Sequence, residues 1–333
     1  MNKQPSKKES EIVLLIDGDV LAYRAAAIAE KREVEVIYKT TGETRLFKNR
    51  TAFKDLLKET DLKFEPDEWE ITDKVEPLNL SLATGIIKKQ MKDLSTALFA
   101  DRCEVFVSGK NNFRDSLPLP KKYKGNRADS IRPIHLRAAK LFMVHNYKAK
   151  ISNGAEADDF LIIRGYEELR QGNIPILITV DKDANAYSGL SVYDFTQESP
   201  QIILLPDFGS LWRTDTKVTG NGFIFLCFQW LFGDPVDDYK PCQLANTKFG
   251  EVAAYKLLKD CETEQQALEV VIQQYKTWYP SEITYTAWDG IEITADYKFM
   301  MDLYYKCAKM KKTEDDQLDA AAFLESFGVQ YEY

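Results

Sequence analysis

Acidic side chains gather in three short clusters, each at the end of an apolar run or at the start of a helical pattern. The clusters are Asp17 with Asp19, Asp181 with Asp183, and Glu156 with Asp158 and Asp159. Carboxylates brought together repel one another unless cations neutralise them. Oxygen ligands without His or Cys favour Mg²⁺ or Mn²⁺. Two such ions can hydrolyse a phosphodiester, one activating water and the other stabilising the leaving oxygen.

Each cluster also has an ordinary structural explanation. Asp-Gly-Asp after a strand is common turn chemistry, and acidic residues in the first turn of a helix interact with its dipole. Asp181-Lys182-Asp183 is also typical of a loop. A fourth cluster, GDPVDD (233–238), is best explained alone as a helix C-cap and turn. The common placement of the first three clusters is what favours a metal site.

Buried strands and helices alternate along the first two thirds of the chain. Strands are expected at 11–17, 103–109 and 174–180, with later candidates at 190–195 and 201–205; helices are expected at 20–30, 82–99, 135–146 and from 155 onward. This alternation predicts a mostly parallel, doubly wound α/β sheet. Such a sheet collects ligands beyond the carboxyl ends of its strands, where the acidic clusters fall.

The remaining segments have different patterns. Residues 33–49 alternate with period two across Thr41-Gly42, which predicts a β-hairpin, whereas 61–80 is expected to be a loop-rich insertion. After residue 217 the pattern is helical. Helices are expected at 224–232, 251–258, 263–278, 297–311 and 315–327.

Charge is unevenly distributed. The net charge is −8, yet residues 110–150 hold eleven Lys or Arg against two Asp. A basic segment in an acidic protein fits a phosphate-binding surface beside an acidic metal site. A solvated basic helix face is the alternative that charge alone leaves open.

Composition narrows the class of protein. With 333 residues, 44% of them hydrophobic, the chain can bury a full core. It has no apolar run long enough for a membrane span and no apolar signal segment near its start. Five cysteines without a CxxC pair and two histidines argue against zinc or disulfides and favour a cytoplasmic protein. The absence of a Gly-rich phosphate loop disfavours common nucleotide-binding enzymes.

Taken in order, six motifs resemble those of the phage and bacterial 5′-nuclease family. They are LLIDGD (14–19), NFR (112–114), YKGNR (123–127), EADD (156–159), TVDKD (179–183) and GDPVDD (233–238). The family contains flap endonucleases and 5′→3′ exonucleases with a PIN-like fold. The resemblance spans roughly two thirds of the chain and implies a twisted sheet flanked by helices, a basic helical arch at 110–150 and a C-terminal helix–three-turn–helix-like part.

The resemblance also implies roles for individual residues. Asp17, Glu156 and Asp158 would bind one Mg²⁺ or Mn²⁺ ion, and Asp159, Asp181, Asp183, Asp234 and Asp237 would surround a second, with Asp19 behind the ligands. Lys124 and Arg127 would act on the scissile phosphate. Tyr123 would stack on a base, and Arg114, Lys121, Lys122 and Lys240 would contact nucleic acid.

The sequence departs from the family pattern at two places. Relatives carry an Asp shortly before the FR dipeptide, where this chain has Ser108-Gly109, so Ser108 or water would replace one carboxylate. The Gly-rich turn that follows the GDxxD segment in the family is reduced here to Gly250. Duplex binding, and a monovalent cation near 234–250, are therefore less secure expectations than catalysis.

These inferences give one expected organisation. A flexible tail (1–10) precedes a nuclease domain (11–216), and a helical DNA-binding part (217–333) follows. The expected activity is two-metal hydrolysis of DNA or RNA/DNA hybrids at 5′ ends, flaps or nicks, in phage replication or recombination, with a replication protein as partner through the C-terminal helices. The alternatives are a catalytically weakened structure-selective DNA-binding protein and a PIN-type ribonuclease acting on structured RNA.

Overall fold

The computed structural model describes residues 9–60, 65–128 and 130–330, and these form two compact units. The larger unit comprises Met1–Val20, Leu94–Ile131 and Val144–Tyr333 within those limits, and the smaller unit comprises Leu21–Asp93 and Arg132–Met143. The larger unit runs through the expected domain boundary at 216/217, and that boundary stays a prediction. Residues 1–8 of the expected flexible tail lie outside the described residues.

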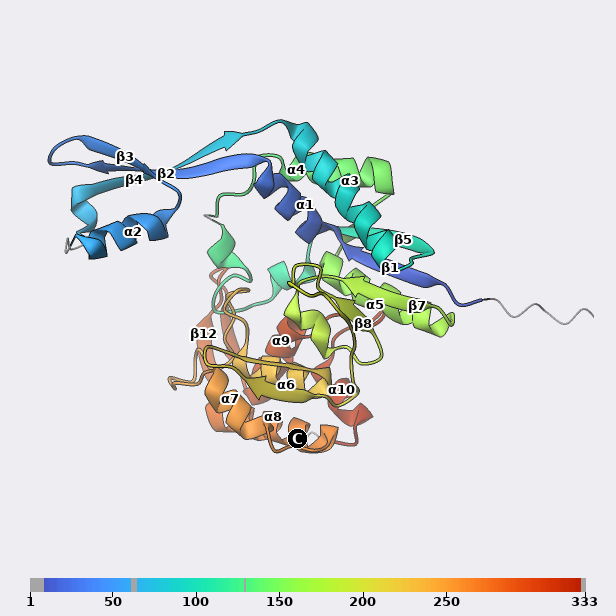
Figure 1. Ribbon diagram of the computed structural model, residues 1–333. Coiled ribbons are helices and arrows are strands. Elements are labelled where there is room, and N and C mark those ends of the chain that lie inside the picture. The colour runs from blue at the N-terminus through green and yellow to red at the C-terminus, as the bar shows by residue number, and fades with distance from the viewer. Residues whose placement is uncertain (1–8, 61–64, 129, 331–333) are drawn as a thin grey trace, which may run out of the picture. The chain divides into compact units, whose positions relative to one another are not determined.

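The larger unit is built on one six-stranded sheet (Figure 1). Its strands, in spatial order, are β6 (Lys150–Asn153), β5 (Arg102–Lys110), β1 (Ile12–Asp17), β7 (Ile174–Ile178), β8 (Ser191–Tyr193) and β9 (Ile202–Leu204). All neighbours are parallel except β8 and β9. This arrangement confirms the predicted mostly parallel α/β sheet.

Strand β1 lies at the centre of this sheet and is fully covered. Val13 to Ile16 have no exposed surface, as expected for an apolar run between two parallel neighbours. Helix α5 (Ala157–Arg170) packs against β1, β5 and β7. At the end of β1, a Cβ atom on Gly18 would lie 2.7 Å from the carbonyl oxygen of Phe106, so only glycine fits where the chain turns.

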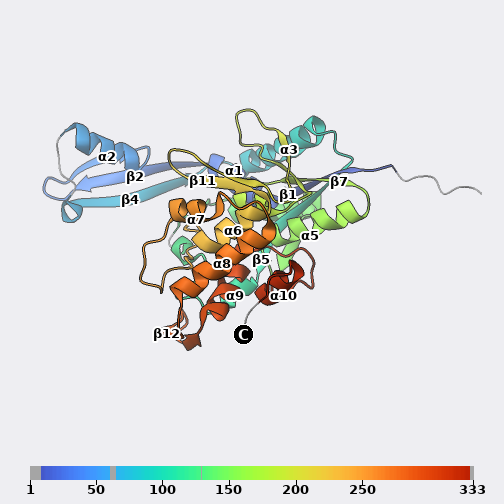
Figure 2. The same ribbon diagram turned by 90° about the horizontal axis from the view of Figure 1, so that it is seen from below.

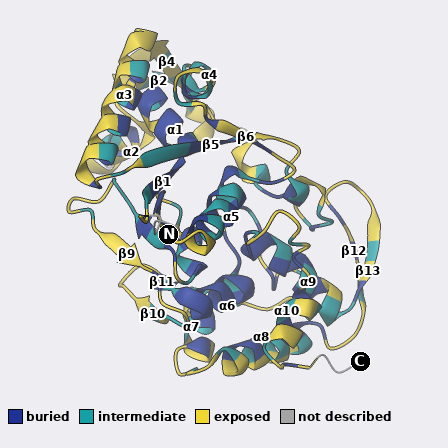
Figure 3. Ribbon diagram, turned by 90° about the vertical axis from the view of Figure 1, so that its right-hand side faces the viewer, coloured by how far each residue is buried: buried dark blue, intermediate teal, exposed yellow. Residues whose placement is uncertain are grey.

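The C-terminal half of the larger unit is mainly helical but contains two hairpins that the sequence pattern did not predict. Its elements are β10 (Ser210–Arg213), β11 (Val218–Asn221), α6 (Gly222–Phe232), α7 (Glu251–Leu258), α8 (Glu264–Trp278), β12 (Ile283–Thr286), β13 (Glu292–Ala295), α9 (Tyr297–Ala308) and α10 (Ala320–Ser326). Helices α6, α8 and α9 lie side by side (Figure 2). Helix α6 is buried along nearly its whole length, whereas α8 has an exposed face (Figure 3).

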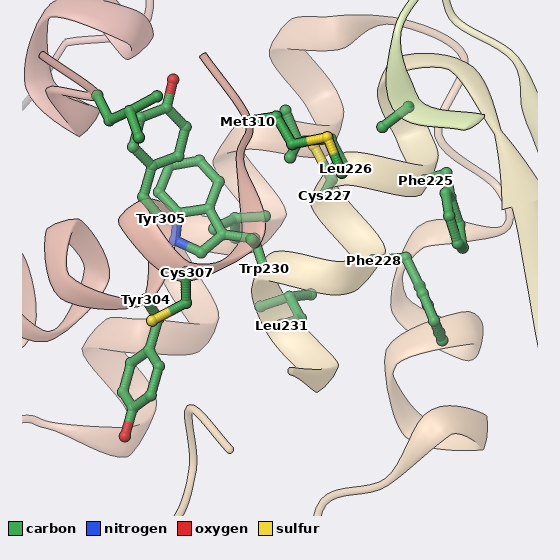
Figure 4. Packing of buried hydrophobic residues seen from close by; sticks show 14 of the residues in the cluster. Phe225, Leu226, Cys227, Phe228, Trp230, Leu231, Tyr304, Tyr305, Cys307 and Met310 are labelled. Atoms are coloured by element: carbon green, nitrogen blue, oxygen red, sulfur yellow. The ribbon is translucent and has the colours of Figure 1, made fainter. Parts of the chain in front are cut away.

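Aromatic packing joins α6 to the later helices (Figure 4). The ring centroids of Trp230 and Tyr305 lie 4.7 Å apart. Trp230 donates its indole N–H to the carbonyl of Met301 at 2.8 Å, and Tyr275 donates its hydroxyl to the carbonyl of Trp230 at 2.9 Å. The polar atoms of the Trp230 and Tyr275 rings thus find partners inside the core, as buried Tyr and Trp usually do.

The smaller unit has its own sheet and core. Strands β2 (Glu30–Tyr38), β3 (Glu43–Phe47) and β4 (Trp69–Pro77) form an antiparallel sheet in the order β3-β2-β4, next to α2 (Arg50–Glu59). Val34, Val36, Phe53 and Leu57 form its core. The hairpin expected at 33–49 is confirmed. The loop expected at 61–80 is wrong from Trp69 onward, because β4 pairs with β2; residues 61–64 lie outside the described residues.

Three helices each contribute to both units: α1 (Gly18–Ile28), α3 (Leu80–Ala97) and α4 (Leu136–Tyr147). Helix α4 is the only α-helix among the described residues of the expected arch at 110–150. Before it come the 3-10 turns η2 (Phe113–Ser116) and η3 (Gly125–Arg127), so the YKGNR motif lies in a turn rather than in a helical arch. Along the described chain, no helix is long and apolar enough to cross a membrane.

Candidate active site

The acidic clusters meet at the carboxyl edge of the central sheet. Asp17 is the last residue of β1, and Asp181 follows the end of β7 by three residues. Glu156 is the N-cap of α5, which starts after β6. Because β1, β6 and β7 run in the same direction, these ends lie on one edge, as the sequence predicted.

Asp17 is buried among groups of the same charge. Its pKa is raised to about 7, mainly by burial and also by the neighbouring carboxylates of Asp19 and Asp181, although two backbone hydrogen bonds oppose the shift. Those bonds come from the N–H groups of Asp19 and Val20, at 2.9 and 3.2 Å. A carboxyl held in this way has a strong tendency to bind a proton or a metal cation.

Three further aspartates show the same tendency. Burial raises the pKa of Asp158 well above its ordinary value, and the charges of Asp17 and Asp181 add to the effect. Burial likewise raises the pKa of Asp181 and of Asp183. Four carboxyl groups on one edge therefore bind a proton, or another cation, more readily than ordinary aspartates do.

Lys124 supplies one cation to this edge. Its ammonium pairs with Glu156 and lies 3.6 Å from Asp237. Burial alone would lower the pKa of Lys124, but these carboxylates raise it above its ordinary value, so the side chain stays charged. Lys124 also adopts a left-handed backbone conformation, with φ of 54°, and donates its N–H to the carbonyl of Asp237 at 2.8 Å.

The GDPVDD segment belongs to the same site, although the sequence alone favoured a simple helix cap there. Asp234 is buried and pairs with Lys182 at 2.9 Å. Asp237 accepts hydrogen bonds from Arg127 at 2.6 Å and from the hydroxyl of Tyr123 at 2.7 Å. The turn after α6 thus places two more carboxylates beside the Asp181 cluster.

Two expected roles are corrected by the structure. Asp159 has no exposed surface, and its carboxylate receives two hydrogen bonds from Arg114, at 2.7 and 3.1 Å. Arg114 is only 2% exposed. Asp159 is therefore a partner of Arg114 rather than an available metal ligand, and Arg114 cannot contact a phosphate from this position.

The expected stacking role of Tyr123 stays a prediction, and the structure shows different contacts for this residue. Its ring is buried against Tyr239, and its hydroxyl is held by Asp237 and, at 3.3 Å, by Glu156. In this conformation the ring of Tyr123 is only 4% exposed. Tyr123 instead orients two of the carboxylates that were expected to bind metal.

Ser108 lies near the end of β5 and contacts the starts of two helices. Its hydroxyl accepts the N–H of Ala157 at 3.2 Å, in the first turn of α5. Its own N–H donates to the carboxylate of Asp19 at 3.1 Å. Ser108 thus joins β5 to the starts of α1 and α5, which differs from the expectation that it fills a ligand position.

Exposed lysines flank the YKGNR and GDPVDD segments in the chain. Lys121, Lys122 and Lys240 are all exposed, as nucleic-acid contacts require. The ammonium of Lys122 lies 4.9 Å from the ring centre of Trp288, which is itself exposed in the β12–β13 hairpin. No local pattern connects Trp288 with this site, because 171 residues separate it from Leu117, whose carbonyl accepts its indole N–H.

Sequence reasoning also missed three supporting residues. Thr179 donates its hydroxyl towards Asp17 at 3.4 Å and accepts the N–H of Asp181. Lys182 pairs with Asp234, and the Gln229 amide donates to Asp183. A signal existed for Gln229, the only polar side chain in the apolar run FIFLCFQWLF.

The donor set suits a hard divalent cation. It consists of carboxylate oxygens without His or Cys, which is the chemistry that selects Mg²⁺ or Mn²⁺. In the conformation of the described residues, no three His, Cys, Asp or Glu side chains are close enough together to hold an ion. Lys124 and Lys182 balance part of the charge instead. The monovalent cation expected near 234–250 stays a prediction.

The fold is similar to those of solved phage nucleases. The bacteriophage T5 D15 flap endonuclease, in a pseudo-enzyme–product complex with DNA and metal ions, has a TM-score of 0.49 at 14% identity over 90% of this chain and 89% of that one. The T5 D15 protein co-crystallised with metal ions has a TM-score of 0.48 at 14% identity over the same shares of the two chains. A mutant of the T5 5′-exonuclease has a TM-score of 0.42 at 12% identity, over 79% of this chain and 87% of that one. No protein-family model matches the chain, and no curated protein does.

Proposed function

We propose that this protein is a divalent-metal-dependent nuclease that hydrolyses phosphodiester bonds of DNA at 5′ ends, flaps or nicks. The observation that supports the proposal is the group of buried or partly buried carboxyl groups with raised pKa at the carboxyl edge of the sheet: Asp17, Asp158, Asp181 and Asp183. Perturbed acidic groups gathered at such an edge are typical of a functional site.

The ligands are divided between two metal positions. Asp17, Glu156 and Asp158 serve one, and Asp181 and Asp183, with Asp234 and Asp237, serve the other. Asp159 is assigned to neither metal position because its carboxylate already accepts two hydrogen bonds from Arg114. Two bound Mg²⁺ or Mn²⁺ ions would supply an activated water and stabilise the leaving oxygen.

Two cations of the chain itself act on the substrate phosphate. Lys124 and Arg127 lie against Glu156 and Asp237, at the rim of the acidic edge. Positive groups fixed at this position stabilise the charge that develops on the phosphate during cleavage. The flanking phosphates of the substrate are bound by Lys121, Lys122 and Lys240, since all three are exposed.

The proposal is tested by cleavage of a 5′-labelled flap, a nicked duplex and a blunt duplex in Mg²⁺. We expect Asp158→Ala and Asp181→Ala each to reduce cleavage by at least about a thousandfold, because each removes a metal ligand. Glu269→Ala, which removes an exposed carboxylate from α8, is the matched control and should cut as the wild type does.

The products identify the activity. Mononucleotides released from the 5′ end indicate an exonuclease, and one cut near the junction indicates a flap endonuclease. Matched RNA flaps in the same assay separate DNA from RNA preference. Wild-type protein that binds flaps tightly but cuts none of these substrates in Mg²⁺ or Mn²⁺ is a DNA-binding protein, and the proposal is then wrong.

A further inference from the structure

The segment Lys306–Lys312, at the end of α9 and just after it, contacts the start of α5. Here it is called the brace. The carbonyls of Lys306 and Lys309 accept hydrogen bonds from Arg114, at 3.1 and 2.8 Å. The backbone N–H of Lys311 donates to the carboxylate of Asp159 at 2.9 Å. A part of the chain without any recognisable motif thus reaches the acidic edge through its backbone.

Arg114 and Asp159 connect the brace to α5. The guanidinium forms two bonds to Asp159 and two to brace carbonyls, a geometry that a single ammonium could not provide. Asp159 also accepts the N–H of Glu156 at 3.0 Å. The position of the first turn of α5, with Glu156 and Asp158 on it, therefore depends on a buried ion pair that the brace holds.

The start of α5, with Glu156 and Asp158, is the first acidic element, and the segment with Asp181 and Asp183 is the second. The brace also contacts this second element. Tyr187, which follows the 3-10 turn η4 (Lys182–Ala186), donates its hydroxyl to the carbonyl of Met310 at 3.2 Å and accepts the N–H of Met310. Asp183 lies in η4. The brace is itself fixed by Lys309, whose ammonium pairs with Asp316 at 3.0 Å.

We propose that Arg114 and Asp159 are positioning residues and that the brace fixes the two acidic elements of the metal site relative to each other. This inference rests on the proposed function and assigns the C-terminal region a role in the site. Outer partners that orient ligands commonly change metal affinity by about 10- to 100-fold when they are removed.

The backbone contact is tested by a matched pair of variants of the full chain. Lys311→Pro removes the N–H that bonds Asp159, whereas Lys311→Ala keeps it and removes only the side chain. We expect Lys311→Pro to weaken Mn²⁺ binding, measured by calorimetric titration, about tenfold relative to Lys311→Ala. Equal Mn²⁺ affinity in the two variants would overturn the proposal.

A second pair separates positioning from ligation. Asp159→Asn should weaken Mn²⁺ binding but keep the wild-type number of bound ions, whereas Asp158→Asn should lose an ion. Arg114→Met should weaken Mn²⁺ binding, and Arg114→Lys should recover part of it, because the charge returns without the paired geometry. If Asp159→Asn loses an ion while Arg114→Met binds Mn²⁺ normally, Asp159 is a ligand and the proposal is wrong.

Hydrogen–deuterium exchange without metal makes the outcome independent of the proposed activity. Lys311→Pro should speed amide exchange at 156–160 at least severalfold, and Lys311→Ala should not. Unchanged amide exchange in Lys311→Pro contradicts the proposed role of the brace. Wild-type protein that binds no Mn²⁺ contradicts the metal site of the proposed function, while the exchange result still decides whether the brace holds α5.

Discussion

Two neighbouring aspartates in α5 have opposite electrostatic environments. Burial raises the pKa of Asp158, and the nearby Asp17 and Asp181 add to it. Burial would raise the pKa of Asp159 too, but Arg114 outweighs it and lowers that pKa below its ordinary value. Consecutive helical residues point about 100° apart, so one faces the sheet edge and the other the core. The motif EADD cannot reveal this division by itself.

Removal of the Lys124 ammonium should affect metal binding and DNA cleavage differently. Its ammonium pairs with Glu156, so a metal ion must compete with it. We expect Lys124→Met to reduce flap cleavage about a hundredfold, the usual effect of removing one group that stabilises transition-state charge. The same variant should bind Mn²⁺ at least as tightly as the wild type in a calorimetric titration.

The control for this prediction is Lys256→Met, which removes an exposed ammonium from α7. It should change neither cleavage nor Mn²⁺ affinity. A Lys124→Met protein that cuts normally would show that the ammonium does not act on the phosphate. Loss of Mn²⁺ binding in that variant would mean that Lys124 only maintains the local structure.

At the scale of elements, ion pairs fasten α5 and β6 to β5. Glu104 on β5 accepts hydrogen bonds from Arg164 on α5 and from Lys150 on β6, the latter at 2.7 Å. Burial alone would raise the pKa of Glu104, but these two cations outweigh it and lower the pKa to about 2. The folded state therefore favours the ionised carboxylate more strongly than the unfolded state does.

The pH dependence of stability follows from this shift. The ordinary pKa of 4.5 applies to the unfolded chain and about 2 to the folded one. The stabilisation is therefore complete above about pH 4.5 and is lost as the pH falls towards 2. We expect Glu104→Gln to cost about 2 kcal/mol at pH 7, after allowing for partial exposure, and almost nothing near pH 2. Urea unfolding at several pH values measures this; a cost that does not change with pH contradicts it.

Much of the sheet could be predicted from sequence because its strands are short apolar runs that end in acidic turns. The run Val13–Ile16 is buried on both sides, so its pattern reports its environment directly. Strand β4 was missed because its residues alternate between intermediate and exposed, and charged side chains dominate it. The hairpins β10–β11 and β12–β13 have only four residues per strand, too few for a periodic signal.

The candidate site was predictable as a set of residue types and not as a set of contacts. Asp17 and Asp181 follow strands, and the topology alone brings them together. The role of Arg114 depends on carbonyls 192 and 195 residues away in the chain, which no local pattern encodes. The contact of Tyr123 was missed for the same reason, since Asp237 accepts the hydrogen bond of its hydroxyl from 114 residues away.

At the scale of the whole molecule, the acidic edge and the C-terminal helices belong to one compact unit, while the antiparallel sheet belongs to the other. Trp230 and Phe53 are buried aromatic residues, one in each unit. A large-to-small substitution in a core removes apolar burial and leaves a cavity. The two residues therefore allow the units to be destabilised separately.

We expect Trp230→Ala and Phe53→Ala each to cost about 3–5 kcal/mol in the unit that contains the residue. Trp230 joins α6 to α9, which leads into the brace, so its loss should also weaken Mn²⁺ binding. Phe53→Ala should leave the number of bound Mn²⁺ ions and their affinity unchanged, because the candidate ligands all lie in the larger unit. Hydrogen exchange locates the loosened unit and calorimetric titration counts the ions. If Phe53→Ala abolishes Mn²⁺ binding, the smaller unit contributes to the metal centre, and the site is not confined to the larger unit.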